Sequence, residues 1–217
     1  MTIKFLHLRN FDIFSQLQIE EALIKADADS WCIINEGSPK YIVMGISNKP
    51  DELLNLAKIK EDKIKIVKRF SGGGTVFVDE GTIFVSFLFS KNHLPFSFPE
   101  EIYSWTDSFY KKIFDSPLFS RIENDYVLKD KKCCGNAQYI KKDRWLHHSS
   151  FLWDFNSLNM DYLKIPKVAP KYRKDRKHQD FLCSISSYFP SKENFIQKIK
   201  EELSKNFKVE MASLKET

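Results

Sequence analysis

Glycine is scarce in this chain, and its few copies are unevenly placed. The 217 residues include only 7 glycines, and three of them are consecutive, at positions 72–74. Consecutive glycines let backbone N–H groups approach a ligand without hindrance from Cβ atoms. The triplet is therefore a candidate binding loop, although taken alone it fits a plain loop equally well.

Paired cysteines and long apolar runs are absent, which argues against a disulfide-rich secreted protein and a membrane protein. The 4 cysteines, at positions 32, 133, 134 and 183, have no CxxC spacing, so reduced thiols are the simplest interpretation. No apolar run is long enough to span a bilayer, and the charged first ten residues do not resemble a signal peptide. We therefore expect a cytoplasmic protein with no membrane partner.

A strong charge of either sign is also absent. The net charge is only +5, and Lys and Arg are spread along the chain except for a basic run at residues 171–177. This distribution gives no reason to expect nucleic acid as a partner. With 42% hydrophobic residues and 19 phenylalanines the chain can form a sizeable core, and its length fits a single domain over residues 1–217.

The glycine triplet lies between predicted strands. Residues 64–68 and 75–78 alternate like strands, and residues 82–89 follow an Asp-Glu-Gly turn, which is a hairpin signal. A loop that joins strand to strand differs from a Walker P-loop and a Rossmann turn, because both of those open a helix. Arg69 and Ser71 beside the glycines favour an anion as the ligand, either a phosphate or a carboxylate.

The remaining pattern predicts an α+β fold with a mixed, largely antiparallel central sheet flanked by helices. Capping signals at Ser15, Ser97 and Ser191 predict the starts of the longer helices. The polar, proline-containing residues 166–179 predict a surface loop. The other predicted strands are residues 3–8, 31–35, 41–46, 124–128, 132–140, 145–155 and 207–211, and the shorter predicted helices are residues 53–59 and 158–163.

A second group of polar residues lies around the predicted hairpin at residues 124–140. Asn124 and Asp125 begin one strand, and Lys132 lies shortly before Gly135 on the next. A lysine is a compact cation on a long stem, suited to a carboxylate or phosphate whose negative charge grows in a transition state. Asp125 could help to hold Mg²⁺ together with a nucleotide phosphate. Taken alone, a hairpin lysine is more often a solvated surface residue.

Two neighbouring histidines, His147 and His148, lie in the following predicted strand. Successive side chains of a strand point to opposite faces, so only one of these imidazoles can face a site. The same geometry argues against the adjacent Cys133 and Cys134 as a metal pair. A zinc site that mixes these cysteines and histidines is left as a minor alternative.

Taken together, these motifs resemble the lipoate-protein ligase A family, within the biotin and lipoate protein ligase superfamily. That family shows Arg-x-Ser-Gly-Gly-Gly, a hydrophobic pair and Asp, to which residues 69–79 correspond. It shows an Asn-Asp pair and then Lys-x-Ser-Gly-Asn/Ser-Ala, to which residues 124–125 and 132–137 correspond. It shows His-His-Gly-Thr in the next strand, to which residues 147–150 correspond.

The resemblance implies a biotin/lipoyl ligase-like catalytic domain that activates lipoic acid or octanoic acid with ATP and Mg²⁺. The acid's carboxylate would attack the α-phosphate to give acyl-AMP and pyrophosphate. The acyl group would then pass to a lysine of a lipoyl carrier domain, belonging to a 2-oxoacid dehydrogenase or a glycine cleavage protein.

The resemblance also implies roles for individual residues. Lys132 would contact the carboxylate and the phosphate through both steps, and Asp125 would lie near the phosphates and Mg²⁺. Phe84, Val85 and Phe87 are candidate walls of an acyl tunnel. The other implied residues are Arg69, Ser71, Gly72, Gly73 and Gly74 for the acyl and carboxylate end, Thr75, Val76 and Phe77 for adenine, Asn124 for the phosphates, and His148 and Ser150 for closing the pocket.

Three positions depart from the family pattern. Phe70 replaces an arginine, Cys134 replaces a serine and Ser149 replaces a glycine. Longer members carry a C-terminal accessory domain, which this sequence does not include. We therefore expect either a separate accessory partner for full adenylation or a reduced mechanism.

Three other functions compete with this one. An octanoyltransferase of the same superfamily would move an acyl chain from acyl carrier protein through a cysteine thioester, without ATP, and the candidate nucleophiles are Cys183 and the pair Cys133 and Cys134. A biotin protein ligase is disfavoured because its Gly-Arg-Gly-Arg loop is absent. A non-catalytic acyl or nucleotide binder would not need the complete set of charged site residues.

The basic residues 166–178 fit either a solvated loop or a surface that steers an acidic carrier domain.

Overall fold

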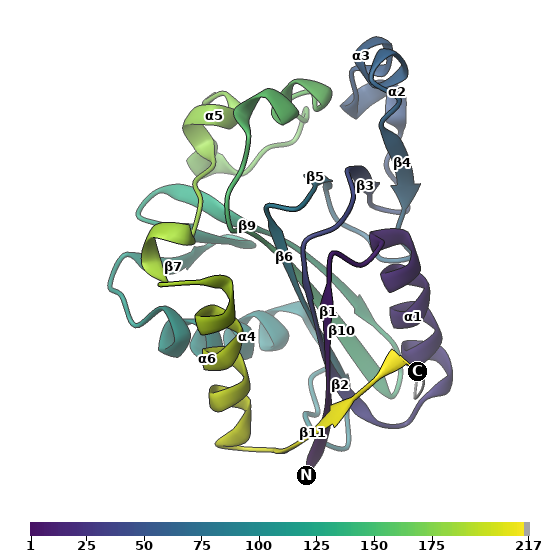
Figure 1. Ribbon diagram of the computed structural model, residues 1–217, viewed down its shortest axis with the longest axis vertical. Helices are drawn as coiled ribbons and strands as arrows, with labels where there is room; N and C mark the ends of the chain where they lie inside the picture. The colour runs from purple at the N-terminus through teal and green to yellow at the C-terminus, as the bar shows by residue number, and fades with distance from the viewer. Residues whose placement is uncertain (215–217) are drawn as a thin grey trace.

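The computed structural model describes residues 1–214, which form a mixed eight-stranded sheet, a three-stranded sheet and flanking helices (Figure 1). The large sheet has the strand order β11-β1-β2-β6-β10-β9-β8-β7, and the small sheet has the order β4-β3-β5. In chain order the elements are β1 (Thr2–Arg9), α1 (Ile13–Ala26), β2 (Ser30–Glu36), β3 (Tyr41–Met44), α2 (Pro50–Leu53), α3 (Leu56–Glu61), β4 (Lys65–Lys68), β5 (Thr75–Val78), β6 (Thr82–Ser90), α4 (Pro99–Phe114), β7 (Phe119–Ile122), β8 (Asp125–Leu128), β9 (Lys131–Ile140), β10 (Arg144–Leu152), η1 (Ser157–Tyr162), η2 (Lys171–Arg173), α5 (His178–Phe181), η3 (Ser186–Tyr188), α6 (Lys192–Ser204) and β11 (Lys208–Ala212).

The predicted fold class is confirmed. In the large sheet only β1 runs parallel to its neighbours, β2 and β11, and the other pairings are antiparallel. Helices α4 and α6 cover one face of this sheet and α1 covers the other (Figure 1). Within residues 1–214 no helix is long and apolar enough to cross a membrane.

Strand β6 shows how the sequence divides the core between these two faces. Its side chains alternate, so Val85 and Phe87 pack with α4 and α6, whereas Phe84 and Leu88 face the side of α1. The expectation that Val85 and Phe87 would wall an acyl tunnel was therefore wrong. Of the three proposed wall residues, Phe84 lines the smaller of the two cavities described below, and Val85 and Phe87 line neither.

Two of the predicted helix starts are displaced. Helix α1 follows Asp12, whose carboxylate accepts a hydrogen bond from the Ser15 backbone N–H (2.9 Å), so Ser15 is not the capping residue. Helix α4 begins at Pro99, and Glu101 accepts bonds from the backbone N–H groups of Ser97 and Phe98. In both helices a carboxylate, and not the predicted serine hydroxyl, accepts hydrogen bonds from backbone N–H groups at the start of the helix.

The predicted hairpin over residues 75–89 was wrong, because the chain changes sheets at its turn. The turn itself is present, with the Thr82 N–H bonded to the Asp79 carbonyl (3.1 Å). However, β5 pairs with β3 in the small sheet, whereas β6 pairs with β2 and β10 in the large one. Figure 1 shows the small sheet and the segment with η1 and α5 above the same end of the large sheet.

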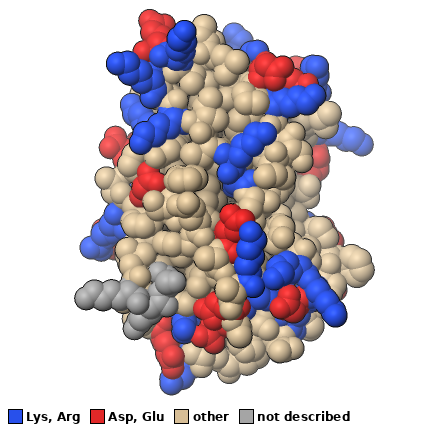
Figure 2. All heavy atoms as spheres, turned by 90° about the vertical axis from the view of Figure 1, so that its right-hand side faces the viewer, with Lys and Arg blue, Asp and Glu red and all other residues tan. Residues whose placement is uncertain are grey.

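The surface carries charges of both signs. On the face drawn in Figure 2, Lys and Arg are scattered and interspersed with Asp and Glu, and they do not merge into one basic patch. This distribution agrees with the modest net charge of +5.

We expect the aromatic core to dominate the stability of this fold. Phe151 is fully buried, and its ring lies 4.9 Å from that of Tyr110 and 5.3 Å from that of Phe195. Phe151→Ala should lower the free energy of unfolding by about 3–5 kcal/mol, because it leaves a cavity between the sheet and its helices. Phe98→Ala, at a ring that is 68% exposed, should change it by less than about 0.5 kcal/mol. Urea unfolding of both variants tests this, and equal losses would contradict it.

Candidate active site

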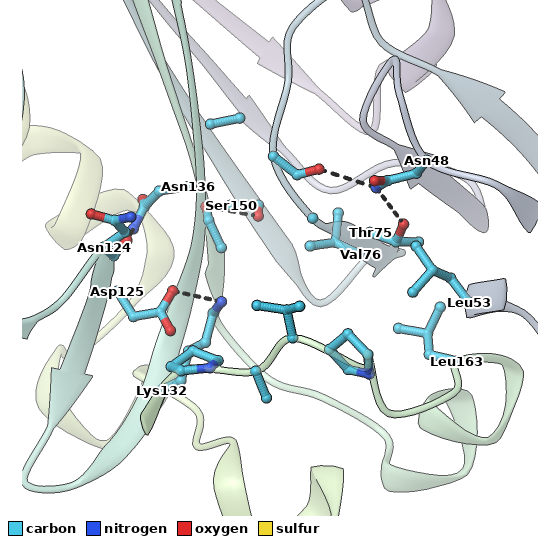
Figure 3. A pocket seen from close by; sticks show the side chains of 18 of the residues that line it. Asn48, Leu53, Thr75, Val76, Asn124, Asp125, Lys132, Asn136, Ser150 and Leu163 are labelled. Carbon is cyan, nitrogen blue, oxygen red and sulfur yellow. Dashed lines mark hydrogen bonds and ion pairs between the residues drawn. The ribbon is translucent and has the colours of Figure 1, made fainter. Parts of the chain in front are cut away.

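A cleft of about 940 Å³ lies between the small sheet and the segment that contains η1 and α5 (Figure 3). The glycine loop and β5 form one side, the first residues of β8 and β9 form the second, and residues 160–182 form the third. Lining residues that the sequence predicted are Gly72, Gly73, Gly74, Thr75, Val76, Phe77, Asn124, Asp125, Lys132 and Ser150. Residues from three separate parts of the sequence therefore meet in one space.

A second cavity of about 100 Å³ adjoins the cleft and extends toward α1. The two meet at the glycine loop and Lys132, and the lining residues that they share are Gly74, Thr75, Val76, Lys132, Gly135, Asn136, Ala137 and Ser150. The inner cavity also has apolar side chains from Ile13, Leu17, Val43, Val78 and Phe84, and polar ones from Gln16, Glu20, Arg69, Ser86, His148 and Ser149. The combined space is a wide cleft with a narrow arm, which we call the apolar arm after its five aliphatic and aromatic side chains.

The glycine loop folds back onto the residues that follow β3. Gly73 has φ +98°, in the region that favours glycine. Gly45 allows the close approach, because a Cβ there would lie 2.3 Å from the Gly73 carbonyl oxygen. The Gly45 N–H bonds to the Gly74 carbonyl and the Ile46 N–H bonds to the Ser71 carbonyl. A Cβ at Gly72 or Gly74 would meet no atom within 4 Å, so the loop keeps an open side.

Arg69 stabilises this loop from behind. Its guanidinium is buried and donates from Nε and Nη2 to the Gly72 carbonyl (3.1 and 2.7 Å) and from Nη2 to the Gly74 carbonyl (2.9 Å). Burial lowers the pKa of Arg69 to about 10, so it is still a cation at neutral pH. Arg69 lines the inner cavity as expected, but these two nitrogens bind the loop. Ser71 is fully buried and lines neither cavity, in contrast to its expected place.

The adenine residues implied by the resemblance lie together on β5. Thr75 and Val76 face the cleft, and the Phe77 ring stacks on Tyr162 with ring centres 5.3 Å apart. Asn48, which the sequence analysis missed, donates from Nδ2 to the Gly73 carbonyl (3.0 Å) and to Thr75 Oγ1 (3.1 Å) (Figure 3). No sequence signal marks Asn48, because it reaches the loop only when β3 and β5 pair.

Lys132 and Asp125 form an ion pair at the edge of the cleft, with 2.7 Å between Nζ and Oδ1 (Figure 3). The other carboxylate oxygen accepts a bond from the Tyr172 hydroxyl (2.8 Å). Burial, reinforced by the Asp125 carboxylate, raises the pKa of the Tyr172 phenol, so it stays a neutral donor. Tyr172 is a second residue that the predicted site lacked, since 47 positions separate it from Asp125.

Close contacts join the residues around Gly135. The Ser150 hydroxyl donates to the Gly135 carbonyl (3.1 Å), and a Cβ at Gly135 would lie 2.8 Å from that hydroxyl oxygen. Asn136 donates from Nδ2 to the Asn124 carbonyl (3.0 Å) and accepts from the Cys134 thiol. Asn124 is thus positioned through its backbone, and Cys134, at a family serine position, takes part in the same network.

The two histidines point to opposite faces of β10, as predicted. His148 lines the inner cavity and pairs through Nδ1 with Glu20 (2.8 Å). Burial alone would raise the pKa of Glu20, but the charge and hydrogen bond of His148, with bonds from Ser86 and Gln16, outweigh it, so the net pKa is lowered. His147 lies in the core, where Gln138 bonds to its Nδ1 (3.2 Å).

A protein-only metal site is not formed. Among residues 1–214, no group of three or more His, Cys, Asp and Glu side chains is placed to hold a metal ion, so the zinc alternative gains no support. The cleft does present carboxylates at Glu123 and Asp125. This donor set fits Mg²⁺ that is held mainly by phosphate oxygens and water, with one or two carboxylates.

The cysteines do not have the properties of an activated nucleophile. Burial raises the pKa of all four thiols. Cys183 lines neither cavity, and its backbone N–H bonds to the Lys132 carbonyl. A thioester-forming cysteine needs a lowered pKa and access to the acyl chain.

Residues 166–179 lie largely at the surface, as the sequence predicted, but the segment also includes η2 and forms one wall of the cleft. Pro166, Val168 and Arg173 line the cleft, and Arg173 is almost completely buried. The segment packs against the ends of β8 and β9, which supply partners for its polar groups. Composition alone could not show this, because the partners lie some 50 residues away.

The fold is that of the lipoyl ligases. A solved structure of lipoate-protein ligase A bound with ATP matches this one with a TM-score of 0.81 at 15% identity, over 100% of this chain and 91% of that one. Residues 12–208 also match the family of the lipoyl protein ligase A/B catalytic domain. The chain therefore belongs to the lipoyl protein ligase A/B catalytic domain family.

Curated relatives carry related names. The chain is 30% identical to the inactive lipoate–protein ligase 2 of Plasmodium falciparum, over 83% of this chain and 62% of that protein. It is also 30% identical to a probable lipoate-protein ligase A of Mycoplasma pneumoniae, over 73% of this chain and 48% of that protein. The chain thus spans less than two thirds of the length of either relative.

The buried His147 should make stability depend on pH. Burial lowers the pKa of His147 to about 3, so from about pH 6.5 downward the unfolded state binds a proton that the folded state does not. Between pH 7.5 and pH 5 this histidine should cost about 2 kcal/mol of stability. We expect the fall in unfolding free energy over that range to be smaller in His147→Gln by about this amount. Identical pH slopes for the two proteins in urea titrations would contradict the assignment.

Proposed function

We propose that residues 1–217 form one catalytic domain of a lipoate–protein ligase, which joins a lipoyl or octanoyl group to a lysine of a lipoyl carrier domain at the expense of ATP. The observation that carries this proposal is the position of Lys132, at the junction of a wide cleft and a narrow arm that contains five aliphatic and aromatic side chains, beside the glycine loop. A reaction between a nucleotide phosphate and a fatty carboxylate needs a cation at such a junction.

In the first step the acyl chain occupies the apolar arm and its carboxylate lies at the junction. The adenosine part of ATP lies along Thr75, Val76 and Phe77, which places the α-phosphate near Lys132. Attack of the carboxylate forms the acyl–phosphate bond and releases pyrophosphate. Lys132 and the open side of the glycine loop stabilise the charge that grows on the α-phosphate. Asp125 and Glu123 would help to hold Mg²⁺, which would supply positive charge to the other phosphates.

In the second step the ε-amine of the carrier lysine attacks the acyl carbonyl. An amide bond forms, the acyl–phosphate bond breaks, and AMP leaves with the electron pair. Lys132 again faces the developing charge, now on AMP. The ion pair with Asp125 and the hydrogen bond from Tyr172 keep this ammonium directed into the cleft.

The carrier domain would approach the mouth of the cleft, where residues 164–171 are basic and exposed. Lys164 and Lys167 line the cleft opening, and the apolar Val168 between them and Lys171 is 91% exposed. Exposed lysines attract an acidic partner over a long range, and an exposed apolar side chain can then be covered by it.

A non-catalytic binder is the second candidate, because a relative with 30% identity is named as inactive. Lys132, Asp125, Arg69 and His148 all take part in formed contacts here, which favours activity. A cysteine-dependent octanoyltransferase is less well supported, since Cys183 lies outside both cavities.

The decisive experiment is an acylation assay followed by mass spectrometry. Wild-type protein with lipoate, ATP, Mg²⁺ and a lipoyl carrier domain should add one lipoyl group to the carrier. Lys132→Ala should slow this by about a hundred-fold or more, because the cation at the transition state is lost. Lys131→Ala, at the neighbouring exposed lysine, should retain nearly full activity.

The rival functions give different results in the same assay. Transfer from octanoyl acyl carrier protein without ATP, lost in Cys183→Ser, would establish the transferase instead. Transfer from synthetic lipoyl-AMP but not from lipoate and ATP would show that activation needs a separate partner. Binding of lipoate without any transfer from either donor would establish the non-catalytic binder.

Salt should weaken the encounter with the carrier. We expect kcat/KM for the carrier to fall several-fold between 50 and 500 mM NaCl. Salt shortens the distance over which the lysines at the cleft mouth attract an acidic partner. Lys164→Ala combined with Lys167→Ala should lower both the rate and its salt dependence. Lys25→Ala combined with Lys112→Ala, elsewhere on the surface, serves as the control. A rate independent of salt would contradict docking at this rim.

A further inference from the structure

The segment from Lys171 to Cys183 is held beside the site by hydrogen bonds to β8, to β9 and to the turns on both sides of β8. The Lys171 N–H bonds to Glu123 Oε1 (2.8 Å), and Tyr172 bonds to Asp125. Arg176 reaches the Asp130 carboxylate (2.8 Å) and the Asp130 carbonyl (2.9 Å). The Cys183 N–H bonds to the carbonyl of Lys132. The segment is thus held in a defined position at the cleft.

One guanidinium of this segment is buried in the cleft wall with a free donor. Arg173 is only 4% exposed; its Nε bonds to the Arg176 carbonyl (2.9 Å), and its guanidinium lies 4.7 Å from the centre of the Phe181 ring. The Nη2 group has no hydrogen-bond partner in residues 1–214, and Arg173 forms no ion pair there. A buried cation without an anion is costly, so the arrangement is suited to receive one.

His178 adds a second unsatisfied group to the same wall. It lines the cleft, and its Nε2 is buried without a partner among the described residues. Burial, and next the charge of Arg173, lower the pKa of His178, against backbone hydrogen bonds with Lys164 and Leu163 that raise it. Within residues 1–214, Asp125 is the one carboxylate in an ion pair with Lys132, Arg173 or His178, and it is shared between Lys132 and Tyr172.

Arg173 and His178 lie apart from the place where the carboxylate of the acyl chain would bind, to judge from which residues line each cavity. Lys132 lines both cavities, whereas Arg173 and His178 line only the wide cleft. A second anion, farther from the apolar arm than the reacting carboxylate, is therefore required to satisfy them. On a nucleotide triphosphate, the groups beyond the α-phosphate have this position and charge.

We propose that Arg173 and His178, next to Lys132, form a polyphosphate site that holds the β- and γ-phosphates of the nucleotide. This inference rests on the proposed function. When the carboxylate oxygen bonds to the α-phosphorus, the bond to the bridging oxygen breaks and pyrophosphate leaves with the electron pair. Arg173 donates hydrogen bonds to that leaving group, because a guanidinium can donate two parallel bonds to phosphate oxygens. His178 donates to it from Nε2 after the phosphates favour a proton on the imidazole.

Lys177 provides a matched control. It belongs to the same segment and is exposed, whereas Arg176 anchors the segment through Asp130 and the carbonyls of Tyr172 and Arg173. Lys177→Met therefore removes one charge without removing an anchor of the segment.

The test is calorimetric binding of inorganic pyrophosphate, ATP and AMP, each with Mg²⁺, to the full chain. Arg173→Met should weaken pyrophosphate and ATP binding by about ten-fold or more and AMP binding by less than about two-fold, since AMP lacks the outer phosphates. His178→Gln should shift the same two ligands in the same direction. Lys177→Met should leave the ratio of ATP to AMP affinity unchanged. Thermal unfolding of each variant identifies losses that come from misfolding, and Arg173→Lys, which keeps the charge, should fall between wild type and Arg173→Met.

The outcomes separate this inference from the proposed function. Equal losses of ATP and AMP binding in a folded Arg173→Met, or unchanged pyrophosphate binding, would overturn the polyphosphate site and leave the ligase proposal standing. Wild-type protein that binds pyrophosphate through Arg173 but neither ATP nor AMP would retain the anion site and overturn the nucleotide part of the proposed function. Wild-type protein that binds none of the three would overturn both.

Discussion

The shape of the site depends on the hydrogen bonds that the buried Arg69 donates to the glycine loop. Three consecutive glycines have many accessible conformations, and ordering them carries a large entropic cost. Arg69 offsets this cost by binding the carbonyls of Gly72 and Gly74 in an environment that water does not reach. Charge-assisted bonds of this kind are among the stronger ones in proteins. The loop is thereby given one shape, with its open side toward the cleft.

The positions of the cleft and of the apolar arm follow from the change of sheets after β5. Because β5 pairs in the small sheet and β6 in the large one, the chain opens a gap between two layers at one end of the molecule. The polar cleft occupies that gap, and the apolar arm extends below it between β6, β10 and α1. A reaction that joins a fatty acid to a nucleotide uses both environments, and Lys132 lies where they meet.

The electrostatics of the cleft are those of a site prepared for anions. Lys132 is paired with Asp125, but Arg173 retains an N–H donor, and His178 a ring nitrogen, without a partner within the described chain. Buried polar groups in proteins are nearly always satisfied, so such exceptions point to a ligand. The segment that carries them is held by hydrogen bonds to the turns on both sides of β8, and therefore the binding groups are arranged before a nucleotide arrives.

The sequence by itself determined the α+β class, the strand-to-strand position of the glycine loop, the opposite faces of His147 and His148, and the family. These features follow from local patterns: alternation, turn residues and short motifs that report on their own neighbours. Only the tertiary structure decided that Arg69 supports the loop and that Ser71 is buried outside both cavities. It also decided that β5 and β6 belong to different sheets. The same holds for the membership of Asn48, Tyr172 and Arg173 in the site. Each of these depends on contacts between residues that are distant in the chain or on the competition between strand partners, and neither is encoded in a local pattern.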